Sequence, residues 1–77
     1  MENNFYKNLK YLRLKNNMRQ EDLARRLGKD YTTIGKWEKN ERTPKLEEVI
    51  RIAELFDVSL HDIIIEDFTN PKKEGEL

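Results

Sequence analysis

Residues 20–38 read QEDLARRLGKDYTTIGKWE, and this stretch decides the fold. Ala24 is small enough for two helices to cross closely, and Gly28 can adopt the positive φ that a tight turn between them needs. Ile34 and Trp37 give the second helix an apolar underside, which leaves its polar front projecting outward. The spacing therefore predicts two short helices at 20–27 and 31–39, joined by a tight turn.

Three more helical patterns flank this pair. Apolar residues recur at helical spacing over 5–16 and 46–56, and Ser59-Leu60-His61-Asp62 resembles a capping box that opens a short fifth helix. No stretch alternates convincingly with period two, so the fold class is all-α, a compact five-helix bundle. The residues expected to face its core are Phe5, Leu9, Leu12, Leu23, Ala24, Leu27, Ile34, Trp37, Leu46, Val49, Ile52, Ala53, Phe56, Ile63 and Ile64.

The ends of the helices carry their own signals. Asparagine is the non-glycine residue that best tolerates the left-handed conformation after a helix, so Asn17 and Asn40 are expected to end helices, as Gly28 does. Asp30 is expected to cap the start of the 31–39 helix. The segment 40–45 is polar and contains a proline, and it is predicted to be a loop.

Composition excludes several classes of protein. A chain of 77 residues has room for a single domain, which we place at 1–68, with 69–77 as a disordered tail. It has no cysteine, a single histidine and a single serine, so no catalytic residues, no metal site and no cofactor are expected. No apolar run approaches the ~18 residues of a membrane span, and no secretion leader is recognisable. These features favour a cytoplasmic, non-enzymatic binding domain.

Charge is distributed unevenly along the chain. Residues 1–45 contain 12 of the 15 Lys/Arg and 6 of the 15 Asp/Glu, a net charge of +6, and residues 46–77 contain the other 3 and 9, a net charge of −6. Such a dipole suggests that one end of the molecule faces a polyanion.

The sequence closely resembles the phage-repressor/Cro-type helix-turn-helix family, also called the XRE family, over about residues 5–64. The matching pieces lie in the family's order and spacing. They are Phe5-x3-Leu9-Lys10-x-Leu12-Arg13, Met18-Arg19-Gln20-Glu21-Asp22-Leu23-Ala24, Leu27-Gly28, Ile34-x2-Trp37-Glu38, Pro44, Ile52-Ala53 and Val58-Ser59-Leu60. The resemblance implies a lambda-repressor-like DNA-binding domain, with a helix-turn-helix at about 20–39 and double-stranded DNA as the partner.

The resemblance also implies roles for individual residues. The 31–39 helix is the family's recognition helix, whose outward residues read base edges. The expected base-contacting residues are Tyr31, Thr32, Thr33, Gly35 and Lys36. The expected phosphate-contacting residues are Arg19, Gln20, Lys39, Asn40, Arg42 and Thr43. Other basic residues among 1–45 are interpreted as solvated surface charges, namely Lys7, Lys10, Lys15, Arg25, Arg26, Lys29 and Lys45. For Gly35 two interpretations remain open: it lets backbone approach DNA closely, or it is an ordinary tolerated glycine.

Two further positions follow from the family pattern. Arg13 and Glu38 stand where many members have an ion pair that ties the first helix to the end of the third. Arg19 stands where the family has a Ser/Thr cap, so about 1 kcal/mol of capping is expected to be lost unless a phosphate contact compensates.

The acidic half carries apolar residues beyond those that a five-helix core needs, namely Ile50, Leu55, Ile65 and Phe68. Two interpretations of these residues remain open. They form a homodimer through the fifth-helix region, around Ile65 and Phe68, on a palindromic operator, or they are extra core and incidental exposure. The resulting hypothesis is a sequence-specific transcriptional regulator, more often a repressor in this family. The alternatives are an antitoxin or bridging-type interaction module on the same fold, or the N-terminal DNA-binding part of a longer repressor. The sequence identifies no effector.

Overall fold

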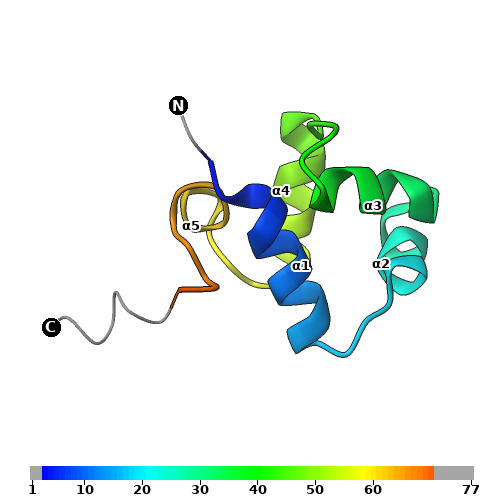
Figure 1. Ribbon diagram of the computed structural model, residues 1–77, viewed down its shortest axis with the longest axis horizontal. Helices are drawn as coiled ribbons and strands as arrows, with labels where there is room; N and C mark the ends of the chain where they lie inside the picture. The colour runs from blue at the N-terminus through cyan, green and yellow to red at the C-terminus, as the bar shows by residue number, and fades with distance from the viewer. Residues whose placement is uncertain (1–2, 71–77) are drawn as a thin grey trace, which may run out of the picture.

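A computed structural model describes residues 3–70, and these residues form five helices with no strand among them. The helices are α1 (Phe5–Lys15), α2 (Gln20–Leu27), α3 (Tyr31–Glu38), α4 (Leu46–Leu55) and α5 (Leu60–Ile65). In Figure 1, α1 runs through the middle of the molecule, with α2 and α3 on one side of it and α5 on the other. The predicted all-α five-helix fold is confirmed. The predicted disorder concerns a tail of which 71–77 lie outside the described residues.

One apolar core joins the five helices. Its buried members are Phe5, Leu9, Leu12, Leu23, Ala24, Leu27, Ile34, Trp37, Val49, Ile52, Ala53 and Ile63. Phe56 and Ile64 are half-buried and pack against this core. The prediction for Leu46 is wrong, because its side chain is 63% exposed. Leu46 is the first residue of α4, and its side chain lies at the edge of the helix's buried face.

The first four helices end in the same way. A residue with positive φ follows each of them: Asn17 (58°), Gly28 (68°), Asn40 (60°) and Asp57 (56°). In each case the next N–H bonds back five residues, as Lys29 does to the Ala24 carbonyl over 2.8 Å, which is the Schellman arrangement. Asn17, Gly28 and Asn40 were predicted from the sequence, whereas Asp57 was not.

The starts of the helices differ from the prediction in part. Ser59 caps α5 as expected, because its hydroxyl accepts the Asp62 backbone N–H over 2.9 Å. Asp30 occupies the cap position of α3, but its carboxylate accepts the Thr32 hydroxyl (3.1 Å) and does not cap a backbone N–H. At α2, Asp22 accepts the Arg19 backbone N–H over 2.8 Å. This hydrogen bond is one half of a capping box, and it offsets part of the capping energy that is lost because Arg19 replaces Ser or Thr. The compensation does not require a phosphate contact.

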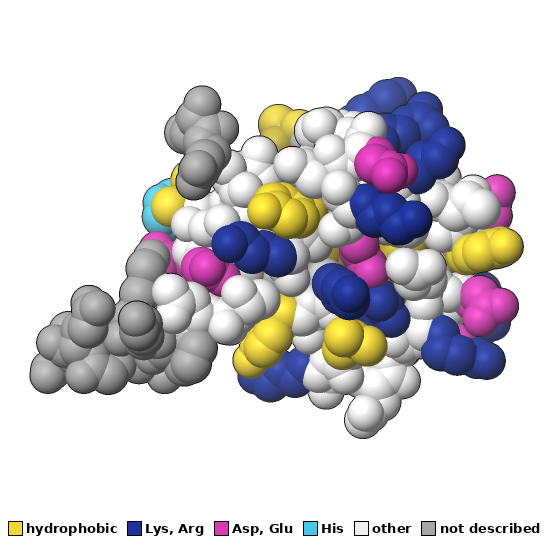
Figure 2. All heavy atoms as spheres, in the orientation of Figure 1, with side chains coloured by type: hydrophobic (Ala, Val, Ile, Leu, Met, Phe, Trp, Pro, Cys, Tyr) yellow, Lys and Arg dark blue, Asp and Glu magenta, His cyan; other side chains and the backbone are white. Residues whose placement is uncertain are grey.

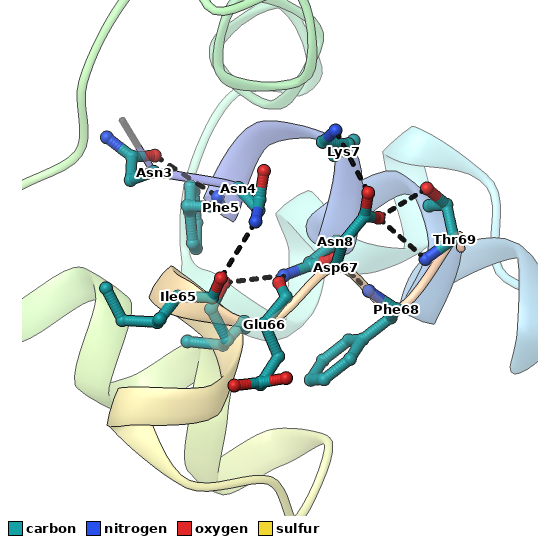
Figure 3. Close-up of polar contacts among 11 residues, drawn as sticks. Asn3, Asn4, Phe5, Lys7, Asn8, Ile65, Glu66, Asp67, Phe68 and Thr69 are labelled. Carbon is teal, nitrogen blue, oxygen red and sulfur yellow. Dashed lines mark hydrogen bonds and ion pairs between the residues drawn. The ribbon is translucent and has the colours of Figure 1, made fainter. Parts of the chain in front are cut away.

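A buried asparagine on α1 fastens the end of α5, as Figure 3 shows. The Asn8 side chain is fully buried and donates through Nδ2 to the carbonyls of Ile63 (2.9 Å) and Glu66 (2.6 Å). Its Oδ1 accepts the Phe68 backbone N–H over 2.9 Å. Asn4 adds two hydrogen bonds to the carbonyls that lie between those of Ile63 and Glu66. Its backbone N–H donates to the Ile64 carbonyl and its side-chain Nδ2 donates to the Ile65 carbonyl. Because a six-residue helix is unstable alone, these contacts hold α5 in place.

An ion pair between Lys29 and Glu48 ties the α2–α3 turn to α4. The hydrogen bond from Lys29 and a second one from the Lys45 backbone N–H hold the pKa of the Glu48 carboxyl below its ordinary value of 4.5. As the pH falls, the unfolded chain therefore takes up this proton before the folded chain does.

We expect the free energy of unfolding to fall as the pH is lowered through and below 4.5, because the contribution of Glu48 is present above its ordinary pKa and is lost as the pH drops through the depressed one. In Glu48→Gln this contribution is absent at every pH, so urea unfolding should depend on pH less steeply than in the parent. Glu47→Gln changes an exposed neighbour and is the matched control. Equal pH slopes for Glu48→Gln and the parent would contradict the assignment.

Candidate nucleic-acid interface

The apolar underside of α3 fixes which way its polar side faces. Ile34 is fully buried and Trp37 is 2% exposed, so both anchor the helix to the core. On the opposite side Tyr31 is 53% exposed, and Thr32 and Lys36 are also exposed. Thr33 and Gly35 are half-buried. The five predicted base-contacting residues therefore all have accessible surface on a helix whose back is held by the core.

The predicted pair between Arg13 and Glu38 is confirmed. Arg13 Nε donates to Glu38 Oε2 over 2.6 Å and Nη2 to Oε1 over 3.0 Å, a bidentate geometry between side chains that are only 8% and 4% exposed. Arg13 Nη1 also donates to the Met18 carbonyl over 2.8 Å, and Gln20 Nε2 donates to Glu38 Oε1 over 3.1 Å. This network joins the end of α3 to α1, to the α1–α2 turn and to the start of α2.

The predicted phosphate-contacting residues fall into two groups in space. Arg19 and Gln20 line a shallow hollow together with Tyr31, at the start of α2. Asn40, Arg42 and Thr43 line a second pocket, at the loop that follows α3. Lys39, which follows the last residue of α3, is exposed and lines neither hollow.

Ion pairing separates the basic residues into two classes. Arg19 contacts Asp22 over 3.3 Å and lies 3.9 Å from Glu21, while Arg25 lies 3.5 Å from Asp22. The hydrogen bond from the Arg19 backbone N–H is the largest cause that lowers the pKa of Asp22, so this carboxylate stays charged beside both arginines. The cations at the start of α2 are thus partly neutralised before any ligand arrives.

The other class consists of exposed cations that make no ion pair within residues 3–70. Along α3 and the following loop these are Lys36, Lys39, Arg42 and Lys45, spaced three residues apart. Figure 2 shows Lys and Arg side chains gathered over the α2–α3 side of the molecule, most densely beside α3. Lys45 was interpreted as an ordinary surface charge from the sequence, although its place in this three-residue spacing was a usable signal.

Other kinds of site are not built by the described residues. Within 3–70, no three His, Cys, Asp or Glu side chains come together in a way that could hold a metal ion. The same residues contain no helix that is both long enough and apolar enough to cross a membrane.

Comparison with known proteins identifies the family. A family model described as helix-turn-helix matches residues 9–63. The chain belongs to the helix-turn-helix family. Two curated relatives named as uncharacterized HTH-type transcriptional regulators support the same assignment. The one from Methanocaldococcus jannaschii is 44% identical over 57 residues, which cover 74% of this chain and 86% of the relative. The one from Archaeoglobus fulgidus is 41% identical over 59 residues, 77% of this chain and 83% of the relative.

Two solved structures share the fold. The restriction-modification controller protein C.AhdI from Aeromonas hydrophila has a TM-score of 0.70 and 27% identity, covering 78% of this chain and 91% of its own. A transcriptional regulator from Listeria innocua, at 20% identity, has a TM-score of 0.79 and covers 99% and 74%. The chain is a DNA-binding helix-turn-helix protein of the transcriptional-regulator class, and this family membership agrees with the prediction that it is not an enzyme.

Proposed function

We propose that this helix-turn-helix protein is a cytoplasmic repressor that binds a palindromic operator in double-stranded DNA as a dimer. The observation that carries the proposal is the polar face of α3, which is held outward by Ile34 and Trp37. This face continues into a run of cations that make no ion pair within residues 3–70. An α-helix fits the major groove, and cations beside it fit the flanking phosphates. Repression then follows from occupancy of the operator.

Within this proposal the residues divide by role. The base contacts are made by Tyr31, Thr32 and Lys36, with Thr33 and Gly35 beside them. The phosphate contacts are made by Arg19, Gln20, Lys39, Asn40, Arg42 and Thr43. Because Lys45 is exposed and makes no ion pair among residues 3–70, we add it to the proposed phosphate-contacting residues. The ion pairs of Arg19 with Asp22 and Glu21 make Arg19 a weaker candidate for a phosphate contact. Each phosphate neutralised should add ~0.9 to the slope of log affinity against log salt.

Lys36→Ala is expected to weaken operator binding by roughly 1–3 kcal/mol and to relax preference at a single base pair, if Lys36 donates to guanine O6 and N7. The measurement is a titration of the variant against the operator and against operators changed at each position. Lys39→Ala is the control, because the loss of a phosphate contact should weaken binding to all DNA sequences by the same factor. Equal losses on operator and random DNA for Lys36→Ala would make Lys36 a phosphate contact instead.

The surface for a second copy is proposed on the α4–α5 side of the molecule. The predicted contacts Ile65 and Phe68 are both half-buried, and the Phe68 ring lies 6.3 Å from that of Tyr11. Ile50, on α4, is 37% exposed, and Leu46 on the same helix is more exposed still. Since α4 packs against α5, we extend the proposed dimer surface from Ile65 and Phe68 to these two residues.

Selection of binding sites from random duplex DNA tests the proposal as a whole. A dimer on a palindrome should select two inverted half-sites whose centres are about 34 Å apart, or a multiple of one helical turn. Selection of a single half-site without symmetry would support sequence-specific DNA binding but would reject the dimer. Recovery of no preferred sequence would reject the regulator.

The exposure of Leu46 and Ile50 also supports a second function, an antitoxin or bridging module that holds another protein. A gel shift on DNA upstream of the gene, with and without the product of the neighbouring gene, separates the two. A specific shift by the protein alone favours the repressor. A shift that requires the neighbour's product favours the interaction module.

A further inference from the structure

The side chain of Gln20 spans the gap between α2 and α3. Gln20 is the first residue of α2 and is half-buried. Its Nε2 donates to Oε1 of Glu38 over 3.1 Å, and among residues 3–70 its side chain makes no other hydrogen bond. Glu38 is itself fixed, because the Arg13 guanidinium holds both of its carboxylate oxygens. The Gln20 amide is therefore anchored on one side by a rigid, buried acceptor.

On its other side the Gln20 amide lies across the bare backbone of α3 at Gly35. A Cβ placed on Gly35 would lie 3.6 Å from Gln20 Oε1, 3.7 Å from Nε2 and 3.9 Å from Cδ, and these are its nearest neighbours. Such distances are ordinary van der Waals contacts, so a methyl group fits. We expect the added carbons of a branched side chain at this position to compete with the amide for space.

We propose that Gly35 and Glu38 form a seat that orients the Gln20 amide toward the DNA backbone. Glu38 takes one N–H of the amide, and the second N–H is left to donate to a phosphate beside the start of α2. Gly35 then acts through Gln20 and not through an approach of its own backbone to DNA. Both Gly35 and Glu38 are positioning residues. This inference rests on the proposed operator binding and names the geometry that one of its phosphate contacts requires.

The proposed seat predicts different operator affinities for two substitutions of Gly35. Gly35→Ala should keep operator affinity within about twofold of the parent, because the methyl group fits beside the amide. Gly35→Val should displace the amide and lose its hydrogen bond to a charged phosphate, which corresponds to a loss of about 10- to 100-fold. Valine is a slightly better helix former than glycine, so helix propensity should not account for a loss of affinity in Gly35→Val.

A double-mutant cycle with Gln20→Ala tests the proposal. If Gly35 acts through Gln20, Gly35→Val should cost little further affinity once the Gln20 side chain is gone. The same cost in both backgrounds, or a comparable cost for Gly35→Ala, would show that α3 itself meets DNA at this point and would overturn the seat. Unfolding temperatures of all variants show whether an affinity change comes from loss of fold.

A measurement without DNA separates this inference from the proposed function. In the free protein the two side-chain N–H resonances of Gln20 should be distinct from those of a solvent-exposed glutamine, and they should stay so in Gly35→Ala. In Gly35→Val they should move to the values of an exposed amide. Unchanged resonances in Gly35→Val would overturn the seat. If the parent protein selects no operator, the proposed function fails and these resonances alone decide the seat.

Discussion

Replacing Arg13 by methionine is expected to lower the free energy of unfolding by about 3–5 kcal/mol, the range observed when one partner of a buried ion pair is removed. The Glu38 side chain is 4% exposed, so without the guanidinium its charge is left in a poorly solvated site. The Met18 carbonyl also loses its hydrogen bond from Arg13. Because the same pair anchors α3 to α1, α3 should lose its fixed orientation along with stability.

Urea unfolding of three variants measures this effect. Arg13→Met alone should show the full loss, while Arg13→Met with Glu38→Leu should recover much of it, because no charge is then left unpaired. Arg25→Met is the control, since its guanidinium lies on the surface and is 73% exposed beside Asp22. If the single and the double variant were equally destabilised, the two side chains would not be coupled and the pair would not be what holds α3.

Replacing Asn8 by leucine is expected to lower the free energy of unfolding by about 2–4 kcal/mol, since each buried polar group that loses its partner costs about 1–3 kcal/mol. Leucine has the same branching of its side-chain heavy atoms as asparagine, but it cannot pair with the carbonyls of Ile63 and Glu66 or with the Phe68 N–H. The loss should be largest in α5, which is too short to persist without these contacts.

Amide hydrogen exchange and urea unfolding together check the prediction for Asn8. Exchange in α5 should become faster than in α2 and α3, because the latter do not depend on Asn8. Asn16→Leu is the control, at the residue that caps the end of α1. Asn16 is exposed, and within residues 3–70 its side chain bonds only to the Leu12 carbonyl one turn earlier. Retention of α5 protection in Asn8→Leu would mean that apolar packing alone holds this helix.

Much of the fold was predictable because helical periodicity and turn residues are local signals. The five helices, the left-handed Asn17 and Asn40 and the turn at Gly28 all follow from such signals. Asn8 was missed because a polar residue within an amphipathic helix is normally on its solvent face, and only the approach of α5 makes it buried. Asp57 was missed because aspartate adopts positive φ less often than glycine or asparagine.

The outward face of α3 was predictable for the same reason, since the buried Ile34 and Trp37 determine which residues lie opposite. The distinction between paired and unpaired cations was not, because it depends on distances between helices and across turns. Arg19 was predicted to contact phosphate, yet its side chain is engaged with Asp22, whereas Lys45 was set aside and is unpaired within residues 3–70. The contact of Gln20 with Glu38 joins two helices, and no local sequence pattern predicts it.

Nuclear magnetic resonance of the labelled protein with a selected operator duplex tests the central claim most directly. The account predicts that amide resonances from Tyr31 to Lys36 shift most, followed by those at the start of α2 and in the loop after α3, and that a scrambled duplex shifts mainly the latter two groups. Perturbations confined to α4 and α5, with α3 unchanged, would contradict the account even though the helical fold is intact.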